Sequence, residues 1–259
     1  MLKNNNQRAK NIITIFSILF VLNVIAIISD LLQYSMLNSI EGFSLEEAES
    51  NDLRQRIVAI ITFGIYILCY IFFILWFRRA YYNLHQVVKH LEHTEGWAAG
   101  AWFVPILNLF RPYQIMRELY IETENYICKV KSDYKKKLNV TFVGIWWTLW
   151  IIASFLERIG MRLNMDAETL EEITRATKIN LANEFFTIPL CLIIIKVIKD
   201  YNNVERELFE IEKNKKASIY SVLLLFKNIK SHLENMSLHY YGLFGILLDT
   251  YILITKTVL

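Results

Sequence analysis

Three histidines lie close together in the chain, and their spacing raises the question of a metal site. Four residues separate His85 from His90 and two separate His90 from His93, with Glu92 and Glu95 beside them. On an ideal helix His90 and His93 are neighbours, whereas His85 points well away from His90. A metal would therefore need ligands from another element as well. We predict interfacial histidines rather than a metal site, and no cofactor.

A second group with potential chemistry is a pair of glutamates followed by an arginine, Glu171, Glu172 and Arg175. Intramembrane CAAX-type proteases carry a similar signature, but here the arginine is one residue too close and no histidine lies nearby. We predict instead a solvated helix, on which Glu171 and Arg175 form an i,i+4 pair. The chain also offers no nucleophile–base pair and no phosphate-binding loop. It therefore favours a non-enzymatic protein over an enzyme.

Three tryptophans, Trp146, Trp147 and Trp150, occupy the middle of an apolar stretch. At about 1.5 Å per residue they lie roughly 12–18 Å beyond Leu138, deeper than the belts where tryptophan usually meets a membrane surface. One interpretation is simple helix packing. The other is an intramembrane pocket for a small molecule or a lipid tail, lined by these rings and by Asn108.

Four apolar stretches position these residues, at 12–32, 57–77, 138–156 and 181–198. Each is close to the 20 or so residues that a helix needs to cross about 30 Å of hydrocarbon, and none alternates as a barrel strand does. Apolar residues make up 54% of the chain and charged residues 20%. We predict an all-α integral membrane protein with four transmembrane helices. The net charge of +3 is too small to indicate nucleic-acid binding.

The charges between the stretches predict the orientation. The N-terminus carries Lys3, Arg8 and Lys10, and both the connector 78–137 and the tail are rich in Lys and Arg, whereas the loop 33–56 is largely acidic. Lys and Arg are retained on the cytoplasmic side. We therefore expect the N-terminus, the connector and the tail to be cytoplasmic, in a multi-pass inner-membrane protein.

The connector 78–137 has three predicted parts. An amphipathic helix continues from the second span through Leu84 and Leu91 to about Glu95. The apolar run 97–110 is too short to cross a bilayer and contains Pro105, which indicates a re-entrant hairpin. A second amphipathic helix begins at Pro112 and runs to the lysine cluster 135–137.

Three sequence blocks resemble a known family. They are WFRRAYYNL at 76–84, EGWAAGAWFVPILNLFRPYQIMREL at 95–119, and the tryptophans of the third span. The pattern is similar to the bacterial membrane family called domain of unknown function 4328, over about residues 57–199. The resemblance implies a four-span membrane domain in a bacterial inner membrane. It implies no activity, because the family's function is unassigned.

The predicted organisation is a four-span membrane domain at 1–214 and a tail at 215–259. In the tail, Ile219, Leu223 and Phe226 indicate another amphipathic helix. The apolar segment 241–258 could be a fifth span or an interfacial helix, because Asp249 opposes insertion. Both interpretations stay open.

Polar residues within the spans predict few special sites. Asn23 could hydrogen-bond across helices. Glu184 and Lys196 are close enough to the span ends to reach an interface, so we expect neither to need a buried partner.

The predicted function is a membrane module that binds lipid, including anionic phospholipid, or a partner membrane protein. The residues expected to contact headgroups or a partner are Arg78, Arg79, Arg111, Arg117, Trp97 and Trp102. A simpler interpretation is that the basic residues serve only to orient the chain. The alternative function is an oligomeric transporter or channel in which 97–110 lines the path. A homo-oligomer is compatible with either function.

Overall fold

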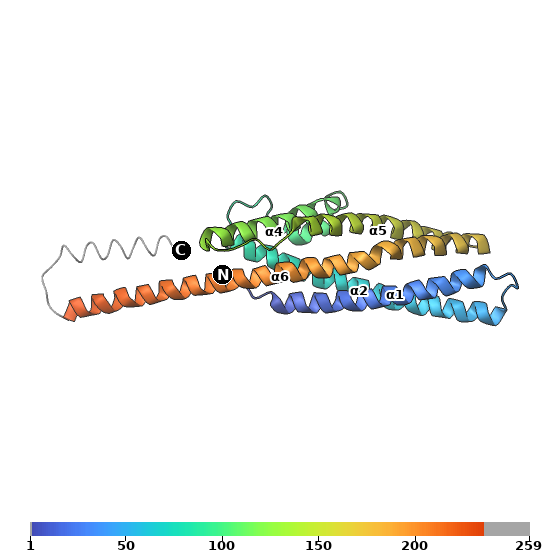
Figure 1. Cartoon of the computed structure of the whole chain (residues 1–259), viewed down its shortest axis with the longest axis horizontal. Helices are drawn as coiled ribbons and strands as arrows, with labels where there is room; N and C mark the ends of the chain where they lie inside the picture. Colours follow the sequence, from blue (N-terminus) through green and yellow to red (C-terminus); the bar gives the residue numbers. More distant parts are fainter. Residues whose placement is uncertain (1, 236–259) are drawn as a thin grey trace. The chain divides into compact units, whose positions relative to one another are not determined.

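The computed structural model describes residues 2–235, and in that range the protein is all-α, without strands (Figure 1). The long helices are α1 (Asn6–Leu37), α2 (Leu45–His85), α5 (Val140–Asp166) and α6 (Leu170–Asn235). The connector contains α3 (Trp97–Gly100), η1 (Ala101–Phe103), η2 (Leu107–Leu109) and α4 (Arg111–Val130). The chain divides into two compact units, Met1–Arg206 and Glu207–Leu259.

The four predicted spans are confirmed as helices. The spans 12–32, 57–77 and 181–198 lie inside α1, α2 and α6, and the span 138–156 begins two residues before α5. All four helices are long and apolar enough to cross a membrane. A helix pairs its backbone N–H and C=O groups with one another, and this is required in hydrocarbon because lipid chains offer no hydrogen-bond partners. Length and hydropathy therefore determine this part of the architecture.

Local signals set the helix starts. Ser44 and Glu47 form a reciprocal capping box at the start of α2, and hydrogen bonds from Ser44 lower the pKa of Glu47. Just before it, Gly42 takes a positive φ of 79°, a conformation that glycine adopts without strain. Pro112 lies in the first turn of α4.

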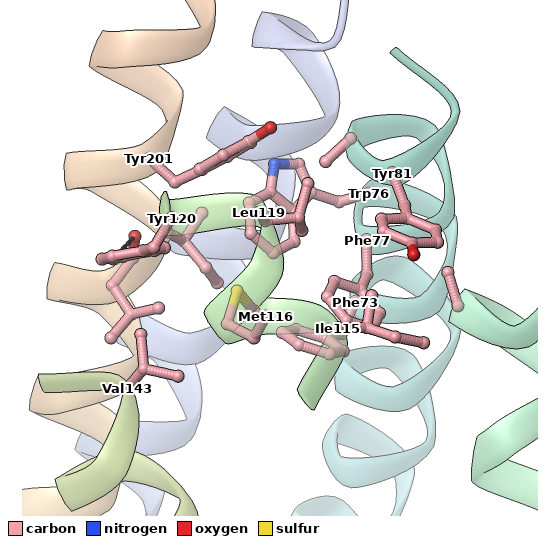
Figure 2. Close-up of a cluster of buried hydrophobic side chains, with 14 of the residues drawn as sticks. Phe73, Trp76, Phe77, Tyr81, Ile115, Met116, Leu119, Tyr120, Val143 and Tyr201 are labelled. Atoms are coloured by element: carbon pink, nitrogen blue, oxygen red, sulfur yellow. Dashed lines mark hydrogen bonds between the residues drawn. The ribbon is translucent and has the colours of Figure 1, made fainter. Parts of the chain in front are cut away.

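The short helix α4 packs against both α2 and α6 within the first unit. Its buried residues recur every three or four positions: Pro112, Ile115, Met116, Leu119, Tyr120, Thr123, Glu124 and Ile127. Figure 2 shows this face between Trp76 and Phe77 of α2 on one side and Tyr201 of α6 on the other. The Tyr120 hydroxyl donates to the Val197 carbonyl at 2.7 Å, which fixes α4 to α6.

Glu124 joins α4 to the start of α5. One of its carboxylate oxygens accepts hydrogen bonds from the backbone amides of Lys137 and Leu138, at 2.6 and 3.0 Å, and from the Tyr134 hydroxyl at 3.1 Å. Asn139 then caps α5 by accepting from the Thr141 amide. The connector is therefore attached to the bundle at both of its ends.

The predicted helix through Leu91 is wrong beyond His85, where α2 ends. The chain folds back there because residues from other elements bind it. The Tyr81 hydroxyl donates to the His93 carbonyl at 3.0 Å, and the Glu92 amide donates to Glu118 of α4 at 2.7 Å. These contacts hold residues 86–96 against the bundle.

In the second unit, the helix predicted around 219–229 is the later part of α6. The apolar segment 241–258 lies outside the described residues.

Candidate functional site

The interior of the first unit contains an apolar cavity of about 90 Å³. We call it the tryptophan cavity, because three of its wall residues are tryptophans. Its lining comes from α1, α2, η1, α5 and α6: Phe16, Leu19, Tyr66, Cys69, Tyr70, Phe73, Trp102, Trp146, Trp150, Thr187, Leu190, Cys191 and Ile194. The cavity is partly open, and the wall residue Tyr70 is half-exposed at the bundle surface.

Trp102 is the hub of the aromatic wall. Its ring makes edge-to-face contacts with Tyr70 and Phe73 of α2, at centroid distances of 6.2 and 5.4 Å, and with Trp150 of α5 at 5.8 Å. Trp146 reaches Phe73 from α5 at 5.9 Å. Aromatic pairs in such arrangements contribute about 0.5–1.5 kcal/mol each beyond their buried area. The wall is therefore a preorganised aromatic frame joining three segments.

Of the predicted pocket residues, the structure brings Trp146 and Trp150 to the cavity together with Trp102, which was predicted to contact headgroups. Trp147 stacks on Trp150 at 4.7 Å, and its indole N–H donates to the Leu109 carbonyl at 3.1 Å, so it anchors the connector. Neither Trp147 nor Asn108 lines the cavity. Its side-chain oxygen is buried and has no hydrogen-bond partner among the described residues.

The segment 97–110 packs against α2 and α5 through one set of residues and leaves another set outside. Ala98 and Ala101 are fully buried. Phe103 and Ile106 are 76% and 73% exposed, although both are large and apolar. The segment thus inserts Trp102 into the bundle and presents an apolar tip at the surface, where a soluble protein would place polar side chains.

The predicted basic residues occupy different surroundings. Arg111 contacts His93 Nδ1 at 3.0 Å, and its guanidinium lies over the Trp97 ring at 5.6 Å. Arg78 pairs with Glu95 at 3.6 Å. Arg117 lies in a separate polar groove beside Glu118. The structure therefore brings Arg111 and Trp97 together, but it places Arg117 among acidic neighbours.

Arg8 adds a basic residue that the prediction left out of the site. Its guanidinium donates to the Leu75 carbonyl of α2 at 2.6 Å. Partial burial, followed by the nearby charges of Arg79 and Arg78, lowers the pKa of Arg8. Arg8, Arg78 and Arg79 therefore form one concentration of positive charge where α1 begins and α2 leaves its predicted span.

The three clustered histidines have separate partners. His85 packs edge-on against Tyr81 at 4.7 Å, His90 lies 3.6 Å from Glu122, and His93 contacts Arg111. Within the described residues no group of three or more His, Cys, Asp or Glu side chains is arranged to hold a metal ion.

A buried polar cluster that the sequence did not reveal connects the N-terminus to α2 and α6. Asn83 donates to Glu205 at 2.7 Å and to the Lys3 carbonyl at 2.8 Å, and it accepts from the Lys3 amide at 2.8 Å. Asn5 donates to Glu205 at 3.1 Å. Burial raises the pKa of Glu205 to about 7, against the opposing hydrogen bonds from Asn83 and Asn5 and the charge of Arg79. We call this cluster the Glu205 clamp.

The expectation that Glu184 reaches an interface is wrong. Only 8% of the residue is exposed, because it lies on the side of α6 that faces α1. The prediction for Asn23 is confirmed: its amide lies 3.6 Å from Cys191 Sγ, across the α1–α6 contact. Lys196 pairs with Asp200 at 2.8 Å.

Comparison with known families completes the description. The family model described as domain of unknown function 4328 matches residues 41–203, well over half of the chain. The chain belongs to this family. It matches no curated protein and no solved structure.

The domain of unknown function 4328 contains most of the tryptophan cavity. Its matched range begins before α2 and ends within α6, so it includes Trp102, Trp146, Trp150 and the α6 wall. The α1 wall residues Phe16 and Leu19 lie before the match, and Glu205 lies just after it.

Proposed function

We propose that the protein is a non-enzymatic membrane module that binds the apolar chain of a lipid in the tryptophan cavity. The observation that carries this proposal is an apolar, partly open cavity among residues of the predicted spans. Apolar cavities stay dry and accept apolar guests. The volume suits a segment of an acyl or isoprenoid chain, while the rest of the chain extends along the bundle surface.

The depth of the cavity suits a lipid of the cytoplasmic leaflet. Its α2 wall residues, from Phe73 back to Tyr66, lie about 6–17 Å inside the end of the predicted span 57–77, at about 1.5 Å per residue. In this proposal the segment 97–110 dips into the same leaflet. Its exposed Phe103 and Ile106 then contact lipid.

The basic residues at the same end supply contacts for an anionic headgroup. Arg8, Arg78 and Arg79 gather there, and Arg111 lies against Trp97. Each such charge near an anionic leaflet is worth about 1 kcal/mol. The simpler role, orientation of the chain alone, explains the charges but gives no reason for the cavity.

The orientation has its own test. With the native cysteines replaced by alanine, Glu47→Cys should react with a membrane-impermeant maleimide in intact cells, and Lys131→Cys should react only after the cells are opened. Labelling of the Lys131 site in intact cells would place the connector outside and contradict the proposal.

The cavity is tested by filling it. Leu190 lines the cavity, whereas Leu192, on the same helix, is half-exposed on the outer surface. Leu190→Trp should lose most of the lipid that native mass spectrometry detects on the purified wild-type protein. Leu192→Trp adds the same side chain outside the cavity and should retain that lipid. Equal lipid content in both folded variants would refute binding in the cavity.

The alternative of a transporter or channel lined by 97–110 finds less support. Trp102, Ala98 and Ala101 fill the space between this segment and the helices rather than bordering an open passage. Solute flux through reconstituted liposomes, absent in empty ones, would favour the alternative.

A further inference from the structure

Two buried carboxyl groups lie on the facing sides of α1 and α6, one turn of α6 beyond the Thr187 wall of the tryptophan cavity. Asp30 of α1 is 6% exposed and Glu184 of α6 is 8% exposed. Both lie just inside the predicted spans 12–32 and 181–198, near the ends remote from the connector. Carboxyl groups in this position are costly to bury as charges.

The helix register brings the two residues together. Asn23 contacts Cys191 at 3.6 Å, and Gln33 donates to Thr177 at 2.7 Å, so α1 and α6 run antiparallel. Asp30 follows Asn23 by seven residues, and Glu184 precedes Cys191 by seven. Seven residues are close to two helical turns, so both residues stay on the facing sides.

Neither carboxylate has a cation paired to it among the described residues. Asp30 accepts one hydrogen bond, from Gln55 at 3.0 Å. The oxygen Oε2 of Glu184 is buried and has no hydrogen-bond partner among the described residues. The nearby Arg54 donates instead to Ser29 and Asn51.

The charged groups around the pair come from each neighbouring helix. Arg54 of α2 lies near enough to Asp30 to attract its charge, and Asp30 lies near enough to Glu184 for two negative charges to repel each other. On α5, the charged group Glu157 interacts electrostatically with Tyr66 and Tyr70 of α2 rather than with this pair. Among the described residues, Arg54 is therefore the cation near the two carboxyl groups, and its hydrogen bonds go to Ser29 and Asn51.

We propose that Asp30 and Glu184 form a carboxyl pair that binds one proton at neutral pH. Two carboxyl groups that share a buried site cannot both ionise readily, so one keeps its proton. The proton removes a charge that would otherwise lie on Glu184 with no hydrogen-bond donor at its oxygen Oε2 among the described residues. This inference does not rest on lipid binding in the tryptophan cavity, and it gives the end of the bundle remote from the connector a proton-dependent contact between α1 and α6.

The test is infrared spectroscopy of the reconstituted full-length protein, through the C=O stretch of protonated carboxyl groups. At neutral pH the wild type should show a band that shifts in D₂O and disappears as the pH is raised. Glu184→Gln should lose one protonated carboxyl, and Asp30→Asn should lower the pH at which the band disappears, because the charge of the partner no longer opposes ionisation of Glu184. Glu172→Gln, at the exposed start of α6, should leave the band unchanged.

Burial raises the pKa of Glu205 to about 7, so this residue is partly protonated at neutral pH and the comparison is made by subtracting each variant's spectrum from the wild-type spectrum. No difference between wild type and Glu184→Gln would overturn the proposal. Loss in Glu184→Gln with an unchanged pH of disappearance in Asp30→Asn would also overturn it, because the proton would then belong to Glu184 alone. If neither variant folds, a wild-type spectrum with no protonated carboxyl at neutral pH contradicts the pair directly.

Discussion

Helix α6 buries two glutamates, Glu184 and Glu205, near opposite ends of its predicted span, and their surroundings differ. Glu205 accepts hydrogen bonds from Asn83 and Asn5 and lies near Arg79. Glu184 has an oxygen without a hydrogen-bond partner among the described residues, and its charged neighbour is another carboxyl group. Buried charges stabilise a fold only when donors surround them. The comparison therefore separates a carboxyl group that protein donors hold in place from one with an oxygen that no protein donor reaches among the described residues.

The largest expected effect is at the clamp. Asn83→Ala removes three hydrogen bonds and leaves buried Glu205 with one amide donor, so the free energy of unfolding should fall by about 4 kcal/mol. Thermal unfolding in detergent, followed by tryptophan fluorescence, measures it. The exposed Asn203→Ala should change stability by less than about 0.5 kcal/mol. Similar losses in both variants would remove the clamp's special role.

The change in the free energy of unfolding with pH should be almost as large as the effect of Asn83→Ala. The pKa of Glu205 is about 7 in the folded protein because of burial, whereas in the unfolded chain it returns to its ordinary value of 4.5. The folded state thus binds more protons at Glu205 between these values, so this residue's contribution to stability falls by about 3 kcal/mol as the pH rises from about 4.5 to 7 and is constant above that.

Glu205→Gln isolates this contribution. The decline with pH over that window should be smaller in the variant by about 3 kcal/mol, with the Asp30–Glu184 pair supplying what remains, whereas Glu207→Gln, close by on α6, should keep the full decline. A wild-type melting temperature that rises steadily across the window would show that Glu205 is ionised in the folded protein.

A smaller effect is expected at Arg111, whose contacts are His93 and aromatic rings rather than a carboxylate. Arg111→Gln should leave folding and orientation intact and reduce co-purified anionic phospholipid about fivefold, equivalent to about 1 kcal/mol. Phosphate analysis of the purified protein measures this. Unchanged lipid content would assign Arg111 a purely structural role.

The smallest expected effect is at Glu184. If the pair carries one proton, Glu184→Gln replaces a protonated carboxyl with a neutral amide of similar shape, and stability at pH 7 should change by less than about 0.5 kcal/mol. The same thermal measurement applies. A loss of 2 kcal/mol or more would indicate that Glu184 is an ionised group with strong partners, as Glu205 is at high pH.

The sequence was sufficient for the four spans and for the start and buried face of α4, although this helix ends at Val130 rather than at the lysine cluster 135–137. A span is predicted from the hydropathy of about 20 consecutive residues, so one unexpected contact does not change the prediction. The α4 helix follows from Pro112 and from apolar residues every three or four positions. Membership of the family also followed from local motifs.

Contacts between distant segments could not be predicted in this way. The end of α2 at His85 depends on Glu118, which belongs to another helix. The burial of Glu184 depends on the register of α1 against α6. An ionisable residue inside a predicted span was nevertheless a signal of a special site, and Asp30 in another span strengthens it.

The candidate site was anticipated in part. The depth of Trp146 and Trp150 pointed to a pocket, but Trp102 belongs to a segment expected to contact headgroups. Its place in the cavity wall depends on how 97–110 packs, which periodicity does not specify. The walls from α1 and α6 likewise required the three-dimensional arrangement.

The central claim is that an apolar chain occupies the tryptophan cavity, and a photoactivatable phospholipid tests it most directly. The protein is reconstituted with an anionic phospholipid that carries a diazirine in its acyl chain, irradiated, and mapped by mass spectrometry. We expect adducts at Trp102, Trp146, Trp150 and the α6 wall, and we expect Leu190→Trp to abolish them. Adducts confined to exposed outer residues such as Phe155 and Leu192, and equally abundant in Leu190→Trp, would contradict the claim.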